Sequence, residues 1–186
     1  MNLDNDNIII QKVLQGDVNA YSELVARYQN YVFTLALRIV KNREDAEEVA
    51  QDSFIKAYSY LKDFRADSKF STWLYTIVQR NAISHLRKKR LETSEMNEER
   101  YEYLADKSSI LENINYNTDK ALLSKAMNLL KPDDASILSL FYLQEQSLEE
   151  IGQIIGLDTN TCKVRLFRAR QKLKVILENN FTELKR

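Results

Sequence analysis

The sequence predicts an all-α protein built from two small helical domains that a polar, acidic linker joins. Its 186 residues include only 3 glycines and 1 proline, and this scarcity of turn residues argues against sheets and irregular folds. Hydrophobic residues at 44% and aromatic residues at 10% suffice for a buried core, so a wholly disordered chain is excluded. The length allows one domain or two small ones, and we predict domains at residues 1–91 and 118–186 with a linker at 92–117.

The first predicted domain contains four helices. Ile8–Gln15 ends at Gly16, and Asp17 can cap the next helix. Asn42 begins a third helix, with Asp45 three residues on as in a capping box. A polar break at 63–69 precedes a fourth helix from about Ser71. The second helix is predicted from apolar residues that recur at helical spacing: Leu24, Tyr28, Tyr31, Val32, Leu35, Ala36 and Ile39.

The middle segment, residues 91–119, is polar and has no sustained helical stripe. Loops longer than about 12 to 15 residues are uncommon inside compact domains, so we interpret the segment as a linker in preference to a loop within one domain. It carries 3 basic and 8 acidic residues between positions 91 and 120.

In the second predicted domain we expect helices near 118–130, 133–144, 148–155 and 159–178. Ser147 and Glu150 form a capping box, Gly156 ends the short helix that follows, and Asp158 can cap the next one. Two short helices joined by a few residues including glycine are typical of a helix-turn-helix. The alternative is an ordinary helical hairpin with a solvated basic face.

The phase of the last helix separates an apolar stripe from a basic face. Cys162 begins a stripe that continues through Leu166, Ala169, Leu173 and Ile176. The opposite face and its edges would lie in a major groove, with central side chains reading base edges and flanking cations holding phosphates. The candidate DNA-binding residues are Lys163, Val164, Arg165, Phe167, Arg168, Gln171 and Lys172.

The fourth helix of the first domain and the loop before it combine cations with aromatic rings. Leu74, Ile77, Val78, Ala82 and Leu86 line its apolar side, where His85 is expected as a packed core residue. Aromatic faces stack on unpaired bases while cations follow the backbone, although these rings could instead close the core of the bundle. The candidates for binding single-stranded nucleic acid are Asp63, Phe64, Arg65, Ser68, Lys69, Phe70, Trp73, Arg80, Ser84, Arg87 and Lys88.

The charge of the chain is zero only in sum. Residues 1–90 carry 14 basic and 11 acidic side chains, and residues 121–186 carry 10 and 8, so the acidic middle segment cancels two basic regions. The third helix adds an acidic strip, in which Asp45, Glu48 and Asp52 share a face with Gln51 at its edge. Such a strip is either a solvated face or the docking surface for a protein partner.

Several classes of function are excluded by residue content. A single cysteine rules out an internal disulfide framework and a cysteine-rich zinc site. We find no catalytic constellation, no phosphate-binding glycine loop and no metal-ligand spacing, and therefore expect no enzyme activity, no catalytic residues, no metal and no cofactor. No apolar run reaches the roughly 18 to 20 residues of a membrane span, and the acidic N-terminus is unlike a signal peptide. We expect a cytoplasmic protein without membrane insertion.

Together, residues 45–90 (DAEEVAQDSFIKAYSYLKDFRADSKFSTWLYTIVQRNAISHLRKKR) and 147–173 (SLEEIGQIIGLDTNTCKVRLFRARQKL) resemble the extracytoplasmic-function class of bacterial sigma-70 RNA polymerase sigma factors. The resemblance runs from about Val18 to Leu177, apart from the linker. It implies a promoter-specificity subunit that binds core RNA polymerase, recognises the −35 and −10 promoter elements and promotes DNA melting. The alternatives are a free-standing helix-turn-helix regulator and a helical adaptor without a nucleic-acid role.

The resemblance also implies partners and a division of labour. The acidic strip Asp45, Glu48, Gln51 and Asp52 would dock on the clamp helices of the largest polymerase subunit. The first domain's loop and fourth helix would hold the melted −10 element, and the last helix would bind the double-stranded −35 element with further polymerase contacts on that side. An anti-sigma factor is a further expected partner. The sequence departs from the family at Arg80 (usually Asn), Ser84 (usually Asp) and Asn160 (usually Gly).

Overall fold

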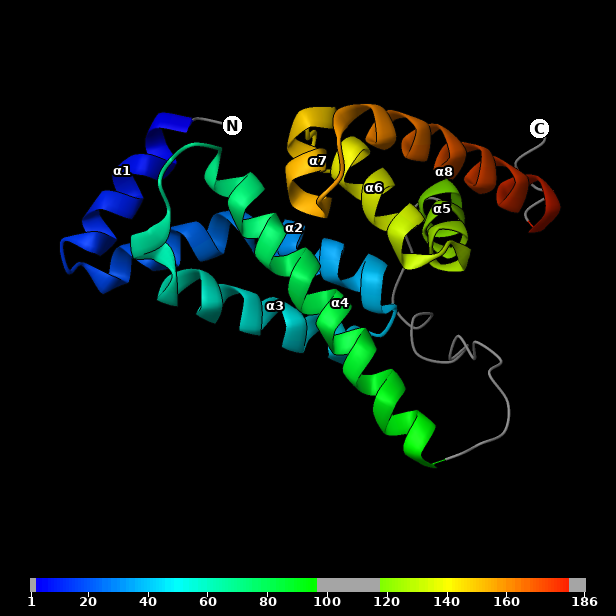
Figure 1. Cartoon of the computed structure of the whole chain (residues 1–186), viewed down its shortest axis with the longest axis horizontal. Coiled ribbons are helices and arrows are strands. Elements are labelled where there is room, and N and C mark those ends of the chain that lie inside the picture. Colours follow the sequence, from blue (N-terminus) through cyan, green and yellow to red (C-terminus); the bar gives the residue numbers. More distant parts are fainter. Residues whose placement is uncertain (1–2, 97–117, 181–186) are drawn as a thin grey trace.

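The computed structural model describes residues 3–96 and 118–180, and every long element in these ranges is an α-helix (Figure 1). This confirms the predicted all-α class. The first domain contains α1 (Leu3–Leu14), α2 (Tyr21–Val40), α3 (Arg43–Ser59) and α4 (Phe70–Met96), with single 3₁₀ turns at Val18–Ala20 and Leu61–Asp63. The second contains α5 (Thr118–Leu129), α6 (Pro132–Tyr142), α7 (Leu148–Ile155) and α8 (Thr159–Asn180).

The first domain is a bundle in which α2, α3 and α4 pack on one another and α1 lies across their end (Figure 1). Its buried core includes Leu24, Leu35 and Leu74, in agreement with the predicted stripes. The Asn42 side chain accepts a hydrogen bond from the Asp45 amide at 2.9 Å and so caps α3 as predicted. The predicted cap at Asp17 is also present, on the 3₁₀ turn that precedes α2.

The pair α7–α8 has the predicted helix-turn-helix geometry. The Ser147 hydroxyl accepts from the Glu150 amide at 3.2 Å, and the Glu150 carboxylate accepts from the Ser147 amide at 2.8 Å, which completes the capping box. Gly156 ends α7 in the left-handed conformation with φ of 73°, a conformation that favours glycine. Asp158 then caps α8 by accepting from the Thr161 amide at 2.9 Å.

Several predicted helix and domain boundaries differ from the structure by a few residues. Helix α4 continues to Met96, past the predicted domain end at residue 91, because the sequence from 91 to 96 contains neither glycine nor proline. Helix α6 begins at Pro132, in the first-turn position where proline is tolerated, and ends at Tyr142 instead of 144. The predicted linker beyond residue 96 lies outside the described residues.

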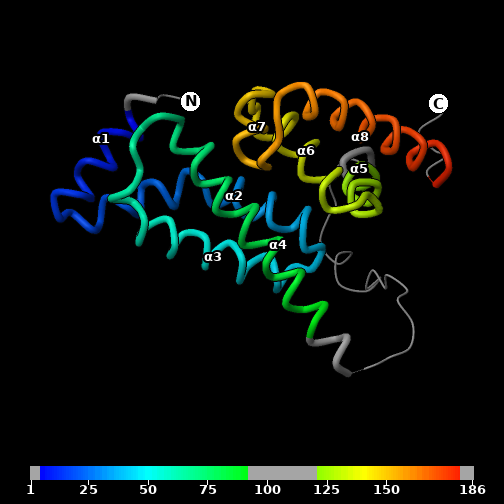
Figure 2. The backbone as a smooth tube through the Cα atoms, viewed as in Figure 1, coloured from blue at the N-terminus to red at the C-terminus, as the bar shows by residue number. Residues whose placement is uncertain are grey.

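The two domains lie side by side. Helix α6 packs on α2, and α7 packs on α4, so elements from opposite ends of the chain are adjacent (Figures 1 and 2). This contact places the start of α4, where −10 contacts are predicted, next to the first helix of the helix-turn-helix.

Candidate nucleic-acid interface

The outward face of α8 is basic at its ends and apolar at its centre. Cys162, Leu166 and Ala169 are buried against the domain, as the phase of the helix predicts. On the opposite side Phe167 is 59% exposed and Val164 is 48% exposed. The polar residues of this face are also exposed: Lys163, Arg168 and Gln171. An exposed aromatic ring between cations suits the major groove, where apolar groups contact the thymine methyl and cations contact phosphates.

Two other predicted residues of α8 are held by the first turn of α6. Arg165 Nη2 lies 3.0 Å from Asp133 Oδ2. Lys172 Nζ lies 2.5 Å from Asp134 Oδ2. Both cations therefore point to the edge where α8 meets α6, and they flank the open face instead of standing at its centre.

The aromatic residues before and in α4 form one cluster. Ring centroids lie 5.8 Å apart for Phe64 and Phe70, 5.3 Å for Phe64 and Trp73, and 5.7 Å for Phe70 and Trp73. Phe70 was predicted to contact DNA, but it is 2% exposed and its ring packs near Tyr28 in the core, so it is not accessible to DNA in this structure. It supports Phe64 and Trp73, which are half-buried at the surface.

The remaining −10 candidates lie along one side of the loop and α4. Asp63 and Arg65 are exposed and Ser68 is half-buried. Lys69 Nζ forms an ion pair with Glu150 Oε1 of α7 at 2.7 Å, so this cation is engaged by the second domain. The exposed residues of α4 continue the basic side of the helix: Arg80, Ser84, Arg87 and Lys88.

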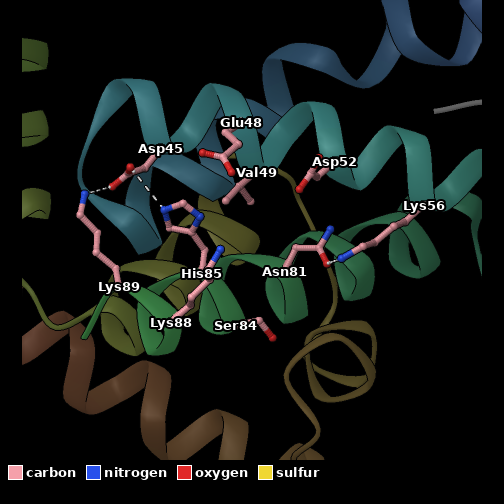
Figure 3. A pocket seen from close by; sticks show the side chains of 10 residues that line it. All are labelled: Asp45, Glu48, Val49, Asp52, Lys56, Asn81, Ser84, His85, Lys88 and Lys89. Atoms are coloured by element: carbon pink, nitrogen blue, oxygen red, sulfur yellow. Dashed lines mark hydrogen bonds and ion pairs between the residues drawn. The ribbon is translucent and has the colours of Figure 1, made fainter. Parts of the chain in front are cut away.

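The acidic strip of α3 faces the basic side of α4 across an open cleft of about 410 Å³ (Figure 3). Asp45 uses both carboxylate oxygens, one 2.6 Å from Lys89 Nζ and the other 3.3 Å from His85 Nε2. Glu48, Gln51 and Asp52 are exposed. In the ranges that the structure describes, the Glu48 and Asp52 carboxylates form no hydrogen bond or ion pair, so Asp45 differs from its two acidic neighbours.

His85 corrects a prediction made from periodicity. It was expected as a packed core residue, but its side chain is 20% exposed and its imidazole lies against the Asp45 carboxylate. The pattern placed it on the apolar side, and the actual partner is a carboxylate of the preceding helix, 40 positions earlier, which periodicity within α4 does not reveal.

The contact between the domains is rich in buried polar side chains. Ser136 Oγ donates to Gln79 Oε1 at 2.7 Å, and Thr72 Oγ1 donates to Gln146 Oε1 at 3.3 Å. Gln144 Nε2 donates to the Tyr31 carbonyl at 3.3 Å. These five side chains and one backbone carbonyl connect α2 and α4 of the first domain with α6 and the α6–α7 turn of the second.

A second group of contacts joins α2 to the C-terminal end of α5. Arg38 donates to Asn128 Oδ1 at 2.9 Å and to the Ser124 hydroxyl at 3.3 Å. Lys41 donates to the Leu130 carbonyl. Burial lowers the pKa of both the Arg38 guanidinium and the Lys41 ammonium. Cations at a helix C-terminus interact favourably with its dipole.

Comparison with known proteins relates this geometry to a family. The model of sigma-70 region 2 matches residues 24–92, and the model of sigma-70 region 4 matches residues 120–173. The chain is 32% identical over 183 residues to the RNA polymerase sigma-H factor of Pseudomonas aeruginosa. The alignment covers 94% of this chain and 95% of that protein. The chain belongs to the sigma-70 family of RNA polymerase sigma factors. It is also 31% identical over 175 residues to the ECF RNA polymerase sigma factor SigW of Bacillus subtilis, with 89% and 92% covered, which places it in the ECF class.

The sigma-factor fold extends to solved structures. The sigma factor RpoE of Bartonella quintana, solved with the anti-sigma factor NepR, aligns with a TM-score of 0.74 at 24% identity over 86% of this chain and 98% of that one. CnrH, solved with the cytosolic domain of CnrY, aligns with a TM-score of 0.66 at 24% identity over 94% and 98%. Both share the fold of this sigma factor.

Sequence reasoning missed three sets of residues in this sigma factor. The carboxylates of Asp133 and Asp134 engage α8, Glu150 engages Lys69, and glutamines and serines join the domains. Only Glu150 had a local signal, as a capping-box residue, and that signal concerns α7 alone. The other pairings cross tens of residues along the chain, and short polar residues on a helix read as a solvated face.

The described part of this sigma factor has no group of three His, Cys, Asp or Glu side chains placed to hold a metal ion. None of its described helices is both long enough and apolar enough to span a membrane.

Proposed function

We propose that this sigma factor is the promoter-specificity subunit of RNA polymerase, binding core enzyme with α3, the −10 element with the loop and α4, and the −35 element with α8. One observation carries the proposal. This chain has both an outward basic recognition face on α8 and a basic, aromatic face on α4. A free-standing regulator would use the first and has no need of the second. Sigma factors act as initiation factors and make no covalent change themselves.

For core docking, the exposed members of the acidic strip are the main candidates. Glu48, Gln51 and Asp52 face solvent beside Ile55, an apolar side chain that is 64% exposed. Charged residues around an exposed apolar anchor are a common form of protein interface. Asp45 holds α3 to α4 through Lys89 and His85 (Figure 3), so we assign it mainly a positioning role.

For the −10 element, Phe64 and Trp73 provide half-buried ring surface and the α4 cations provide phosphate contacts. Extruding an unpaired base costs a few kcal/mol, which stacking and hydrogen bonds in a pocket offset. Arg80 and Ser84, where the family usually has Asn and Asp, are exposed on this helix, so the −10 base preference of this factor is expected to differ from that of typical relatives.

Promoter binding requires the domains to separate. Positions −35 and −10 are 25 base pairs apart, which corresponds to roughly 85 Å of B-form DNA. In this structure α7 lies directly on α4, so the two DNA-binding regions are too close to contact both elements. The 21 residues between α4 and α5 can span at most about 70 Å when fully extended. The lengths of the two domains add to this span, so the chain is long enough to reach both promoter elements.

We also propose an anti-sigma factor as a partner. The support is by similarity, because RpoE of Bartonella quintana was solved with the anti-sigma factor NepR. A partner that stabilises the contact between α4 and α7 would keep the −10 region covered.

In vitro transcription tests the function directly. The full chain is added to core RNA polymerase, and start sites are mapped across genomic DNA. The expected result is a defined set of starts that core enzyme alone does not produce, with a shared element near −35. No start sites beyond those of core alone would overturn the proposal.

Docking is tested by reversing the exposed carboxylates in Glu48→Lys with Asp52→Lys. We expect at least a hundredfold weaker binding to core polymerase, since like charges across an interface cost several kcal/mol. The matched control reverses two exposed carboxylates elsewhere, Glu23→Lys with Glu178→Lys, and is expected to bind core as the native chain does. Equal affinity of the two double variants would sink the assignment of α3.

A further inference from the structure

Two of the cations predicted to bind promoter DNA are paired with carboxylates of the same domain. Asp133 and Asp134 lie in the first turn of α6, and they reach Arg165 and Lys172 at 3.0 Å and 2.5 Å. All four side chains line an open cleft of about 480 Å³ between the start of α6 and the recognition helix. The lining includes predicted base-reading residues as well: Val164 and Arg168.

The two ion pairs differ in burial, and this difference separates their roles. The Asp134 side chain is only 8% exposed, and a buried carboxylate without its cation is strongly unfavourable. Lys172 is therefore needed to neutralise the Asp134 carboxylate and is not available to a DNA phosphate. Asp133 and Arg165 are 52% and 37% exposed, and ion pairs in water are weak and readily exchanged.

We infer that Asp133 competes with DNA phosphates for Arg165 and thereby limits sequence-independent binding of duplex DNA, whereas Lys172 is a structural residue fixed by Asp134. The inference rests on the proposed role of α8 as the −35 recognition helix. Sequence-independent binding depends on phosphate contacts alone. A reduced gain from Arg165 therefore weakens every complex, and only complexes that add base contacts from α8 stay tight.

The competition has a signature in the salt dependence of binding. While Arg165 stays with Asp133, it contacts no phosphate and releases no counterion from DNA. In Asp133→Asn the guanidinium of Arg165 is available to a phosphate, so the plot of log affinity against log salt concentration should steepen by up to about 0.9, the value for one more phosphate contact.

The experiment measures fluorescence anisotropy of the full chain on a labelled duplex of random sequence, between about 50 and 200 mM salt. Asp133→Asn should bind about three- to tenfold more tightly at the low end and show the steeper slope. The control Glu145→Gln removes an exposed carboxylate of the same domain and should match the native chain. Equal affinity and slope for Asp133→Asn and the native chain would overturn the inference.

A second background distinguishes competition from simple repulsion between Asp133 and DNA. In Arg165→Gln there is no cation to release, so adding Asp133→Asn should change neither affinity nor slope. If Asp133→Asn raises the affinity equally in both backgrounds, repulsion is sufficient and the competition is rejected.

The same measurements keep the two proposals apart. If Arg165→Gln weakens duplex binding but Asp133→Asn has no effect, only the present inference fails. If Phe167→Ala with Arg168→Ala leaves binding to the mapped promoter unchanged, the assignment of α8 fails and the inference fails with it. Thermal unfolding tests the role of Lys172. Lys172→Ala should lower the melting temperature, whereas Lys172→Arg should keep it near that of the native chain. Arg165→Gln should leave the melting temperature unchanged.

Discussion

The two basic helices of this sigma factor differ in how accessible their predicted DNA-binding residues are. On α8 the central aromatic residue Phe167 is 59% exposed and faces away from the rest of the molecule. At the start of α4, Lys69 is paired with Glu150 of the other domain, and Thr72 is 1% exposed and donates to Gln146 of that domain. The centre of the predicted −35 surface is open in this structure, whereas the predicted −10 surface is partly covered by the domain that carries α8.

The composition of the domain contact explains how the covered surface can become available. Interfaces that never open are mainly apolar, like a domain core cut in two. Here Gln79, Ser136, Thr72 and Gln146 form buried polar contacts beside an apolar core that continues through both domains, and each of these polar side chains can bond to water when the domains part. We expect this contact to open, which would expose the start of α4.

The largest expected effect comes from removing the exposed side chains at the centre of α8. Phe167→Ala with Arg168→Ala should weaken binding to the mapped promoter by about 1–3 kcal/mol for each lost base contact. The measurement is holoenzyme binding to that promoter. Val175→Ala, at a residue of α8 that is 52% exposed and further along the helix, is the control. Promoter affinity within twofold of the native factor would mean that α8 does not read bases.

The next prediction removes the covering of α4. Ser136 is 1% exposed and bonded to Gln79, so Ser136→Glu places a carboxylate in the closed contact at a cost of about 3 kcal/mol. We expect the domains to separate, which interdomain fluorescence transfer measures as a longer distance. Circular dichroism should show that the helices persist. Leu129→Glu, at an exposed site, should keep the native distance, and an unchanged distance in Ser136→Glu would contradict the account of the contact.

A third prediction damages the helix-turn-helix while sparing the first domain. A Cβ at Gly152 would lie 2.5 Å from the Leu157 carbonyl oxygen, so a side chain there forces the turn apart. Gly152→Val should destabilise the second domain by about 1–3 kcal/mol, seen as a lower melting temperature. Core binding through α3 should persist while −35 recognition is lost. Loss of both together would show that the two domains fold as one unit.

The sequence was informative where the determinants of structure are local. Ser147, Gly156 and Asp158 act within a few residues of their own positions, and the phase of α8 depends only on helical spacing. The predicted helix caps, and the apolar stripe predicted for α8, are therefore present in the structure. The family resemblance extended this to function, because it rests on the combination of both motifs.

Prediction failed where partners are distant in sequence. Gln79 and Ser136 are 57 positions apart, and Lys69 and Glu150 are paired across the domain contact. A polar residue on a helix carries no mark of whether it faces water or another domain. Phe70 shows the same limit for aromatic residues, since core and stacking surface require the same ring, and only its burial distinguishes them.

The smallest expected effect is a pH dependence of the domain contact at the Lys69–Glu150 ion pair. Burial by itself raises the pKa of Glu150, but hydrogen bonds from Lys69 and from Ser147 outweigh it, and the net pKa lies below its ordinary value of 4.5. A carboxyl group with a depressed pKa in the folded state contributes stability above its unfolded pKa and loses it as the pH falls through the folded value. The Lys69–Glu150 pair should therefore be intact at neutral pH and weaken only below about pH 4.5. Interdomain fluorescence transfer between pH 7 and pH 4, with Lys69→Met as the variant in which the pair is absent, measures this. The native factor should open more readily as the pH falls, and Lys69→Met should show a smaller change, because residue 69 no longer carries the cation that Glu150 holds.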